Sequence, residues 1–227
     1  MTGRRVPPGS VGALQRVMRN APSRRDGERC EMCAEPVEQS HPHVVDLDSR
    51  ELMCTCRPCS FLFVPEGAAA GRYRAVPERY QQFPEFALTR AQWEALGVPV
   101  GMAFFFRNSR LGRVVAFYPS PAGATESELT VAGWEEVVAV NPGLADAEPD
   151  VEAVLVADRN VEGPVGAGED AFDCFLVPID ACYELVGHLR RQWRGFDGGQ
   201  EVRERLQRFF DDLRTRSRPV RTGQEAS

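Results

Sequence analysis

Two short cysteine pairs constrain this chain more than any other feature of its sequence. Cys30 and Cys33 form one Cys-x-x-Cys pair, Cys56 and Cys59 form the second, and 22 residues separate the two pairs. Each pair can turn two sulfurs toward one point, and a tetrahedral Zn²⁺ site takes four such ligands. The spacing therefore predicts a small module in which four thiolates converge on one metal ion.

The segment between the pairs has the pattern of a β-hairpin. "HVVDLDSRELMCTC" holds two β-prone runs on either side of Asp48-Ser49-Arg50-Glu51, which are residues typical of turns. A hairpin would carry the second cysteine pair back beside the first. We therefore expect residues 28–65 to form a zinc-ribbon-like β-hairpin module.

The residues around the cysteines favour zinc over iron as the bound metal. A rubredoxin-type iron site uses the same four thiolates, and its knuckles carry Gly or another small residue after the second Cys. Here Ala34 and Ser60 occupy those places. The second pair encloses Arg57 and then Pro58, whereas the rubredoxin-type order has Pro first. Zn²⁺ is the expected cofactor. Iron, alone or in a cluster, is the alternative, and reduced cysteines without metal are a further one.

Three more donors lie inside the same segment. Cys54 and Cys56 are two residues apart on a predicted strand, so they share a face about 6–7 Å apart. Cys54 is interpreted as a small buried residue beside the metal, with an alternative ligand and a reactive thiol as the other readings. His41 and His43 share a face in the same way. They are either surface imidazoles, or one of them is an alternative ligand or a donor to a thiolate.

The rest of the chain predicts an α+β domain over residues 66–216, with a mixed or antiparallel sheet and helices on one face. Residues 65–86 have repeated Gly and Pro and are expected to hold little regular structure. Apolar periodicity then predicts a short helix capped by Thr89 (89–97), a hairpin (100–120) and a helix ended by Asn141 (129–144). It also predicts two strands (151–159 and 173–180) and two C-terminal helices (179–193 and 202–213). Residues 1–27, rich in Arg, and 217–227 are expected to be flexible tails.

Two loops have a structural and a functional interpretation. Residues 120–128 contain Thr125-x-x-Glu128, a capping box for the next helix, and the alternative is a ligand-binding loop. In "WRGFDGG", Gly195 would end one helix and Asp197 would cap the next, with Trp193 and Arg194 as candidate contact residues. Cys174 and Cys182 lie in apolar segments and are predicted to be core residues.

Charge and composition exclude several classes of protein. All 27 basic side chains other than His are arginines, so chemistry that needs a lysine is excluded, and the net charge of −6 argues against nucleic-acid binding. Residues 120–180 carry fourteen acids and one arginine, which predicts a solvated face or a docking surface for a basic partner. No apolar run is long enough to cross a membrane, and no signal peptide is evident. We therefore expect a cytoplasmic protein with reduced thiols.

Three stretches carry a resemblance to a known family. "RCEMCAEPVEQSHPHVVDLDSRELMCTCRPCSFLF", "AFYPSPAGATESEL" and "CYELVGHLRRQWRGFDGG" resemble an uncharacterised bacterial family encoded near [NiFe]-hydrogenase genes. The resemblance covers most of residues 28–215 and supplies no catalytic residues. It implies an accessory protein that docks on a hydrogenase subunit or maturation factor. The alternative is a rubredoxin-like protein that transfers single electrons. The sequence holds no recognisable catalytic set, which favours a non-enzymatic role.

Overall fold

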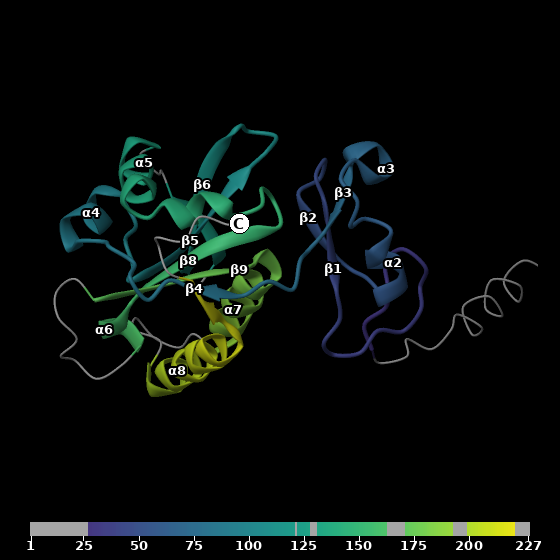
Figure 1. Ribbon diagram of the computed structural model, residues 1–227. Coiled ribbons are helices and arrows are strands. Elements are labelled where there is room, and N and C mark those ends of the chain that lie inside the picture. The colour runs from purple at the N-terminus through teal and green to yellow at the C-terminus, as the bar shows by residue number, and fades with distance from the viewer. Residues whose placement is uncertain (1–26, 121, 128–130, 163–170, 193–198, 221–227) are drawn as a thin grey trace, which may run out of the picture.

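The computed structural model describes residues 27–120, 122–127, 131–162, 171–192 and 199–220 (Figure 1). The predicted tails, except for residue 27 and residues 217–220, lie outside these residues, as do Glu128 and the predicted helix caps Gly195 and Asp197 with Trp193 and Arg194. In the described part of the chain, no helix is both long and apolar enough to cross a membrane.

The N-terminal module is built on the predicted hairpin. Strands β1 (His43–Asp46) and β2 (Glu51–Cys54) pair antiparallel, and β3 (Tyr73–Ala75) adds to the other edge of β1. The Asp46 carboxylate shapes the turn, because it accepts hydrogen bonds from the backbone N–H of Asp48 at 2.9 Å and of Ser49 at 3.3 Å. Helix α2 (Arg57–Phe61) and the single turn α3 (Ala68–Gly71), in which Ala69 and Ala70 have positive φ, complete the module.

Strand β3 lies beyond residue 65, where the sequence placed the end of the module. The segment expected to hold little regular structure thus contributes α3 and β3 to the module, and β4 (Gln81–Gln82) to the second sheet. Three- and two-residue strands leave almost no periodic signal in a sequence, because a period of two needs several residues to be recognised.

The second sheet has seven strands in the order β10-β4-β9-β8-β5-β6-β7, which confirms the predicted α+β class. All neighbours are antiparallel except β10 and β4, which are parallel, so the sheet is mixed. The further strands are β5 (Met102–Asn108), β6 (Arg113–Ser120), β7 (Gly123–Ser127), β8 (Glu152–Asp158), β9 (Phe172–Pro178) and β10 (Arg218–Pro219). The short segments α6 (Arg159–Glu162) and η1 (Pro142–Asp146) flank β8.

Helices cover both faces of this sheet, so the expectation of helices on one face was wrong. Helices α7 (Ile179–Gln192) and α8 (Gly199–Arg216) pack on one face with Phe104. Helices α4 (Arg90–Ala95) and α5 (Val131–Val140) pack on the other with Phe105, which stacks on Trp134 at 4.2 Å between ring centroids. Strands β5, β8 and β9 are apolar on both faces. Burying a large apolar side chain stabilises the folded state by about 1.5–3 kcal/mol, so each face of the sheet is covered by helices.

Of the two N-terminal helix caps predicted at described threonines, one is confirmed and the other is wrong. Thr89 caps α4, because its hydroxyl accepts from the Gln92 N–H at 3.2 Å and Gln92 Oε1 accepts from the Thr89 N–H. Thr125, by contrast, lies in β7 opposite Tyr118 of β6. Ser and Thr side chains suit several local structures, and here the hairpin with β6 determines the outcome.

Part of the acid-rich segment is paired with arginines inside the molecule. Glu152 is fully buried, and Arg79 Nε donates to its Oε1 at 2.7 Å. Other acids of residues 120–180 pair with arginines outside the segment: Glu126 with Arg113, Glu148 with Arg74, Asp158 with Arg90, and Asp173 with Arg214. Asp173 also pairs with Arg159, the arginine of the segment itself. The buried acids Glu152, Asp158 and Asp173 therefore hold the fold together rather than facing water.

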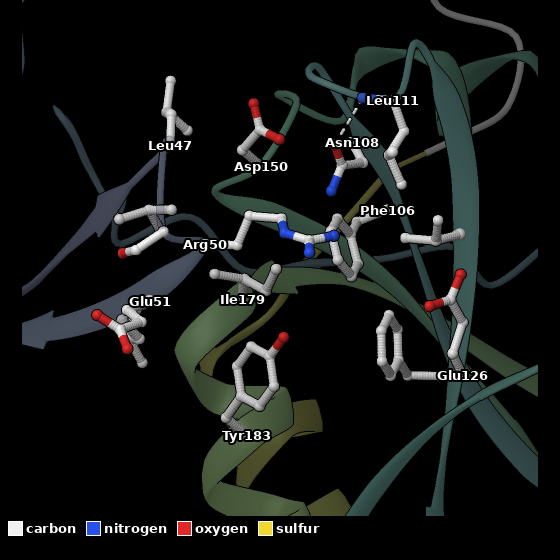
Figure 2. Close-up of a pocket in the computed structure, with 15 residues that line it drawn as sticks. Leu47, Arg50, Glu51, Phe106, Asn108, Leu111, Glu126, Asp150, Ile179 and Tyr183 are labelled. Atoms are coloured by element: carbon white, nitrogen blue, oxygen red, sulfur yellow. Dashed lines mark hydrogen bonds between the residues drawn. The ribbon is translucent and has the colours of Figure 1, made fainter. Parts of the chain in front are cut away.

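The module packs directly on the second sheet. Val45 of β1 and Val76, just after β3, belong to the same buried cluster as Phe104 and Ile179. Beside this contact lies a cavity of about 360 Å³, lined by the tip of the β1–β2 hairpin, by β5 and β6, and by α7 (Figure 2). Figure 2 shows Arg50 extending from the hairpin into this space.

Candidate metal centre

The first cysteine pair is held in a tight reversal of the chain. The Cys30 N–H donates to the carbonyl of Glu35 at 2.8 Å, and the Ala34 N–H donates to the carbonyl of Cys30 at 2.8 Å. Ala34 adopts the left-handed conformation with φ of 62°, which an L-residue with a Cβ rarely takes. This geometry turns Cys30 and Cys33 toward one side.

The second cysteine pair lies at the start of α2. Cys56 occupies the N-cap position, with extended φ and ψ, and Pro58 stands in the first turn, where its missing N–H costs nothing. The Ser60 N–H donates to the carbonyl of Cys56 at 3.0 Å, which closes the first turn. Cys59, three residues after Cys56, therefore lies on the same side of the helix.

The four sulfurs meet. The Sγ atoms of Cys30, Cys33, Cys56 and Cys59 all lie within 4.8 Å of one another, and those of Cys33 and Cys56 are 3.6 Å apart. A tetrahedron with metal–sulfur bonds of about 2.3 Å has edges of about 3.8 Å. The sequence-predicted residues thus form a cluster that could hold a metal ion, and four thiolates suit both zinc and iron.

The thiols of this cluster cannot all ionise easily by themselves. Burial opposes ionisation of Cys30, but backbone hydrogen bonds, led by that from Cys56, lower its pKa to about 6. The hydrogen bond with the Cys56 side chain, followed by burial, raises the pKa of Cys59 to about 12. A cation among the sulfurs would favour the charged form of each one, so metal binding would release protons.

The three additional donors gather in a second group. His41, His43 and Cys54 each place a ligand atom within 4.8 Å of the others. The antiparallel register explains this, because His43 of β1 stands directly opposite Cys54 of β2, and His41 and His43 have ring centroids 4.7 Å apart. The spacing of residues within either strand does not reveal this group. Pairing the two strands of the predicted hairpin would have brought these donors together.

The remaining cysteines are core residues, as the sequence predicted. Cys174 of β9 and Cys182 of α7 are buried, at 1% and 0% exposure. Burial raises the pKa of both thiols well above the ordinary value. They are therefore neutral packing residues and are separate from both donor groups.

Comparison with known proteins identifies one family. Residues 29–217 match the model of a family described as "Family of unknown function (DUF5947)". No curated protein and no solved structure matches the chain.

Proposed function

We propose that this chain, which belongs to DUF5947, a family of unknown function, is a zinc-binding accessory protein. It would assist the assembly, maturation or function of a [NiFe]-hydrogenase by docking on a subunit or maturation factor. The observation that carries the metal-binding part is the convergence of Cys30, Cys33, Cys56 and Cys59. The hydrogenase part rests on the resemblance of the sequence motifs described above.

A closed, structural metal site suits this role better than a catalytic one. Four thiolates saturate tetrahedral zinc and leave no position for a substrate. The three-stranded sheet is small, with strands of four, four and three residues, so it buries little apolar surface of its own. Metal binding would then supply a large part of the free energy that orders the module.

An exposed apolar surface next to the metal site supports docking on another protein. Phe61, Leu62 and Val64, which we call the α2 patch, are 57%, 66% and 65% exposed. They lie two to five residues after Cys59, at the end of α2 and just beyond it, so metal binding at Cys59 would help to fix their positions. Neighbouring exposed apolar side chains frequently mark protein–protein contacts.

Hydrogen uptake in the native organism tests the hydrogenase part of the proposal. Deleting the gene should lower uptake while transcripts of the structural subunits remain. Complementation with the wild-type gene should restore uptake. A Leu62→Ser/Val64→Ser double variant of the α2 patch should not restore it, because the docking surface has become polar. Unchanged uptake in the deletion strain, under conditions where the hydrogenase is expressed, would overturn the proposal.

A matched control separates docking from general destabilisation. Val140 is 54% exposed at the end of α5, far along the chain from the metal site, so Val140→Ser should restore uptake fully. Affinity capture with the same three proteins should recover a hydrogenase subunit or maturation factor with wild type and Val140→Ser only. Equal recovery with the patch variant would rule out this surface.

Electron transfer through iron is the second candidate, because the same four thiolates suit a rubredoxin-type site. Colour distinguishes the two functions. A zinc protein purified from its native host absorbs no visible light, whereas a ferric four-thiolate site is red. A red protein that bleaches on reduction would replace the zinc proposal with this one.

A further inference from the structure

A second set of metal-ligand side chains lies at the end of the β1–β2 hairpin that is nearer the cysteine pairs. His43 and Cys54 are cross-strand partners, and His41 lies two residues before His43 with its ring 4.7 Å away between centroids. Their three ligand atoms lie within 4.8 Å of one another, a spacing from which they can converge on one ion. None of them belongs to the four-cysteine cluster.

Both imidazoles are already oriented by hydrogen bonds through Nδ1. His41 Nδ1 lies 2.8 Å from the carbonyl oxygen of Glu38, and His43 Nδ1 lies 2.8 Å from Asp180 Oδ2. A carbonyl and a carboxylate can only accept, so each Nδ1 carries a proton, and in the neutral tautomer with this proton Nε2 presents a lone pair. Metal-bound histidines in proteins almost always have this arrangement, with an oxygen acceptor on the nitrogen that does not bind the metal.

Among the described residues, the free nitrogen of His41 has no hydrogen-bond partner. Its Nε2 is buried, since only 6% of the His41 side chain is exposed, and no described residue forms a hydrogen bond with it. Leaving a buried polar atom unpaired costs about 1–3 kcal/mol. A metal ion bound to this lone pair would remove that cost, and the neighbouring imidazole and thiol are the ligands that such an ion requires.

We propose that His41, His43 and Cys54 form a second metal site, separate from the four-cysteine site. Two imidazole nitrogens and one thiolate are ordinary ligands for Zn²⁺ and for ions of the same borderline class. Three protein ligands leave one tetrahedral position for water or another exchangeable ligand. The site therefore differs in kind from the saturated four-cysteine site, and it does not depend on the hydrogenase proposal.

Metal stoichiometry of the full-length protein tests the proposal. Wild-type protein dialysed against excess Zn²⁺ and then against metal-free buffer should retain two equivalents by elemental analysis. His41→Phe keeps the size and shape of the ring but has no ligand nitrogen, and it should retain one equivalent. Cys54→Ala should also retain one, whereas Cys174→Ala, a change to a buried cysteine in β9, should retain two.

Cobalt provides the second measurement, which needs no variant. Titration of wild-type protein with Co²⁺ should show two phases, because a four-thiolate site and a site with one thiolate have different visible and near-ultraviolet bands. His41→Phe should keep only the four-thiolate spectrum. A single phase that saturates at one equivalent of Co²⁺ in the wild type, or equal metal content in wild type and His41→Phe, would overturn the proposal.

Discussion

His43 donates from Nδ1 to Asp180 Oδ2 at 2.8 Å, across 137 residues of sequence. The histidine lies on β1 of the cysteine module, and the aspartate lies in the first turn of α7 on the seven-stranded sheet. The same carboxylate accepts the Ala181 N–H at 2.8 Å through its other oxygen, so its orientation is fixed from both sides. A side chain of the second candidate metal site is thus positioned by the other half of the molecule.

This contact predicts that Asp180 affects the metal affinity of the His41–His43–Cys54 site without binding the metal itself. Asp180→Ala removes the acceptor for His43 Nδ1, and loss of such a partner typically lowers metal affinity about 10–100-fold. The change should affect the His41–His43–Cys54 site and leave the four-cysteine site intact. Competition with a chromophoric chelator measures both affinities. Asp180→Asn retains an acceptor oxygen and should lose less, and identical affinities in all three proteins would contradict this account.

Loss of one knuckle cysteine should release the metal and loosen the module. In Cys33→Ser the four-cysteine site keeps three sulfurs, and we expect loss of its bound metal together with faster amide hydrogen exchange over residues 29–63. Cys54→Ser should keep this metal and the slow exchange around it. Elemental analysis and exchange measured by mass spectrometry provide the two readouts. Equal loss of the four-cysteine metal in both variants would make Cys54 a ligand of that site.

The buried Glu152 predicts a large effect at Arg79. Glu152 is fully buried, and Arg79 donates to both of its carboxylate oxygens. Arg79→Met leaves this carboxylate without its partner, which should lower the free energy of unfolding by about 3–5 kcal/mol. Arg113→Met breaks the exposed pair with Glu126 and should cost less than about 1 kcal/mol. Urea unfolding measures both, and similar costs would show that burial of the pair does not matter.

Asp46 predicts an acid-sensitive contribution to stability. Its hydrogen bond from Arg72, at 2.6 Å, is the main cause that lowers the pKa of Asp46 from 3.8 to about 2 in the folded protein. Because the folded value is the lower one, the contribution is complete above the unfolded pKa and is lost as the pH falls toward about 2. The difference in unfolding free energy between wild type and Asp46→Asn should therefore shrink as the pH falls from 3.8 to about 2. Exposed Asp48→Asn is the control and should have a small effect throughout.

The seven-stranded domain should fold without the cysteine module but with lower stability. A fragment of residues 66–227 keeps the two large helices and the whole second sheet. It loses Val45, which is buried against that sheet, and β3 loses its partner β1. We expect a cooperative thermal transition at a lower temperature than that of the full chain. A molten or insoluble fragment would mean that the two units share one indispensable core.

The sequence alone determined the local and strongly periodic parts of this protein. The two Cys-x-x-Cys pairs, the turn at Asp48 and the cap at Thr89 each depend on residues a few positions apart, and each was predicted correctly as a local structure. The long strands and the two C-terminal helices were recognisable because their apolar residues recur over several periods. Their order was sufficient to place the chain in the α+β class.

Only the tertiary structure decided which distant residues meet. Thr125 has the local pattern of a cap, yet pairing with Tyr118 makes it part of a strand, because the hydrogen bonds of a sheet outweigh a single side-chain preference. The acid-rich segment gives no sign of its arginine partners, most of which come from other parts of the chain. The acceptor of His43 is 137 residues away. Such contacts depend on how the elements pack in three dimensions, and spacing along the chain does not encode them.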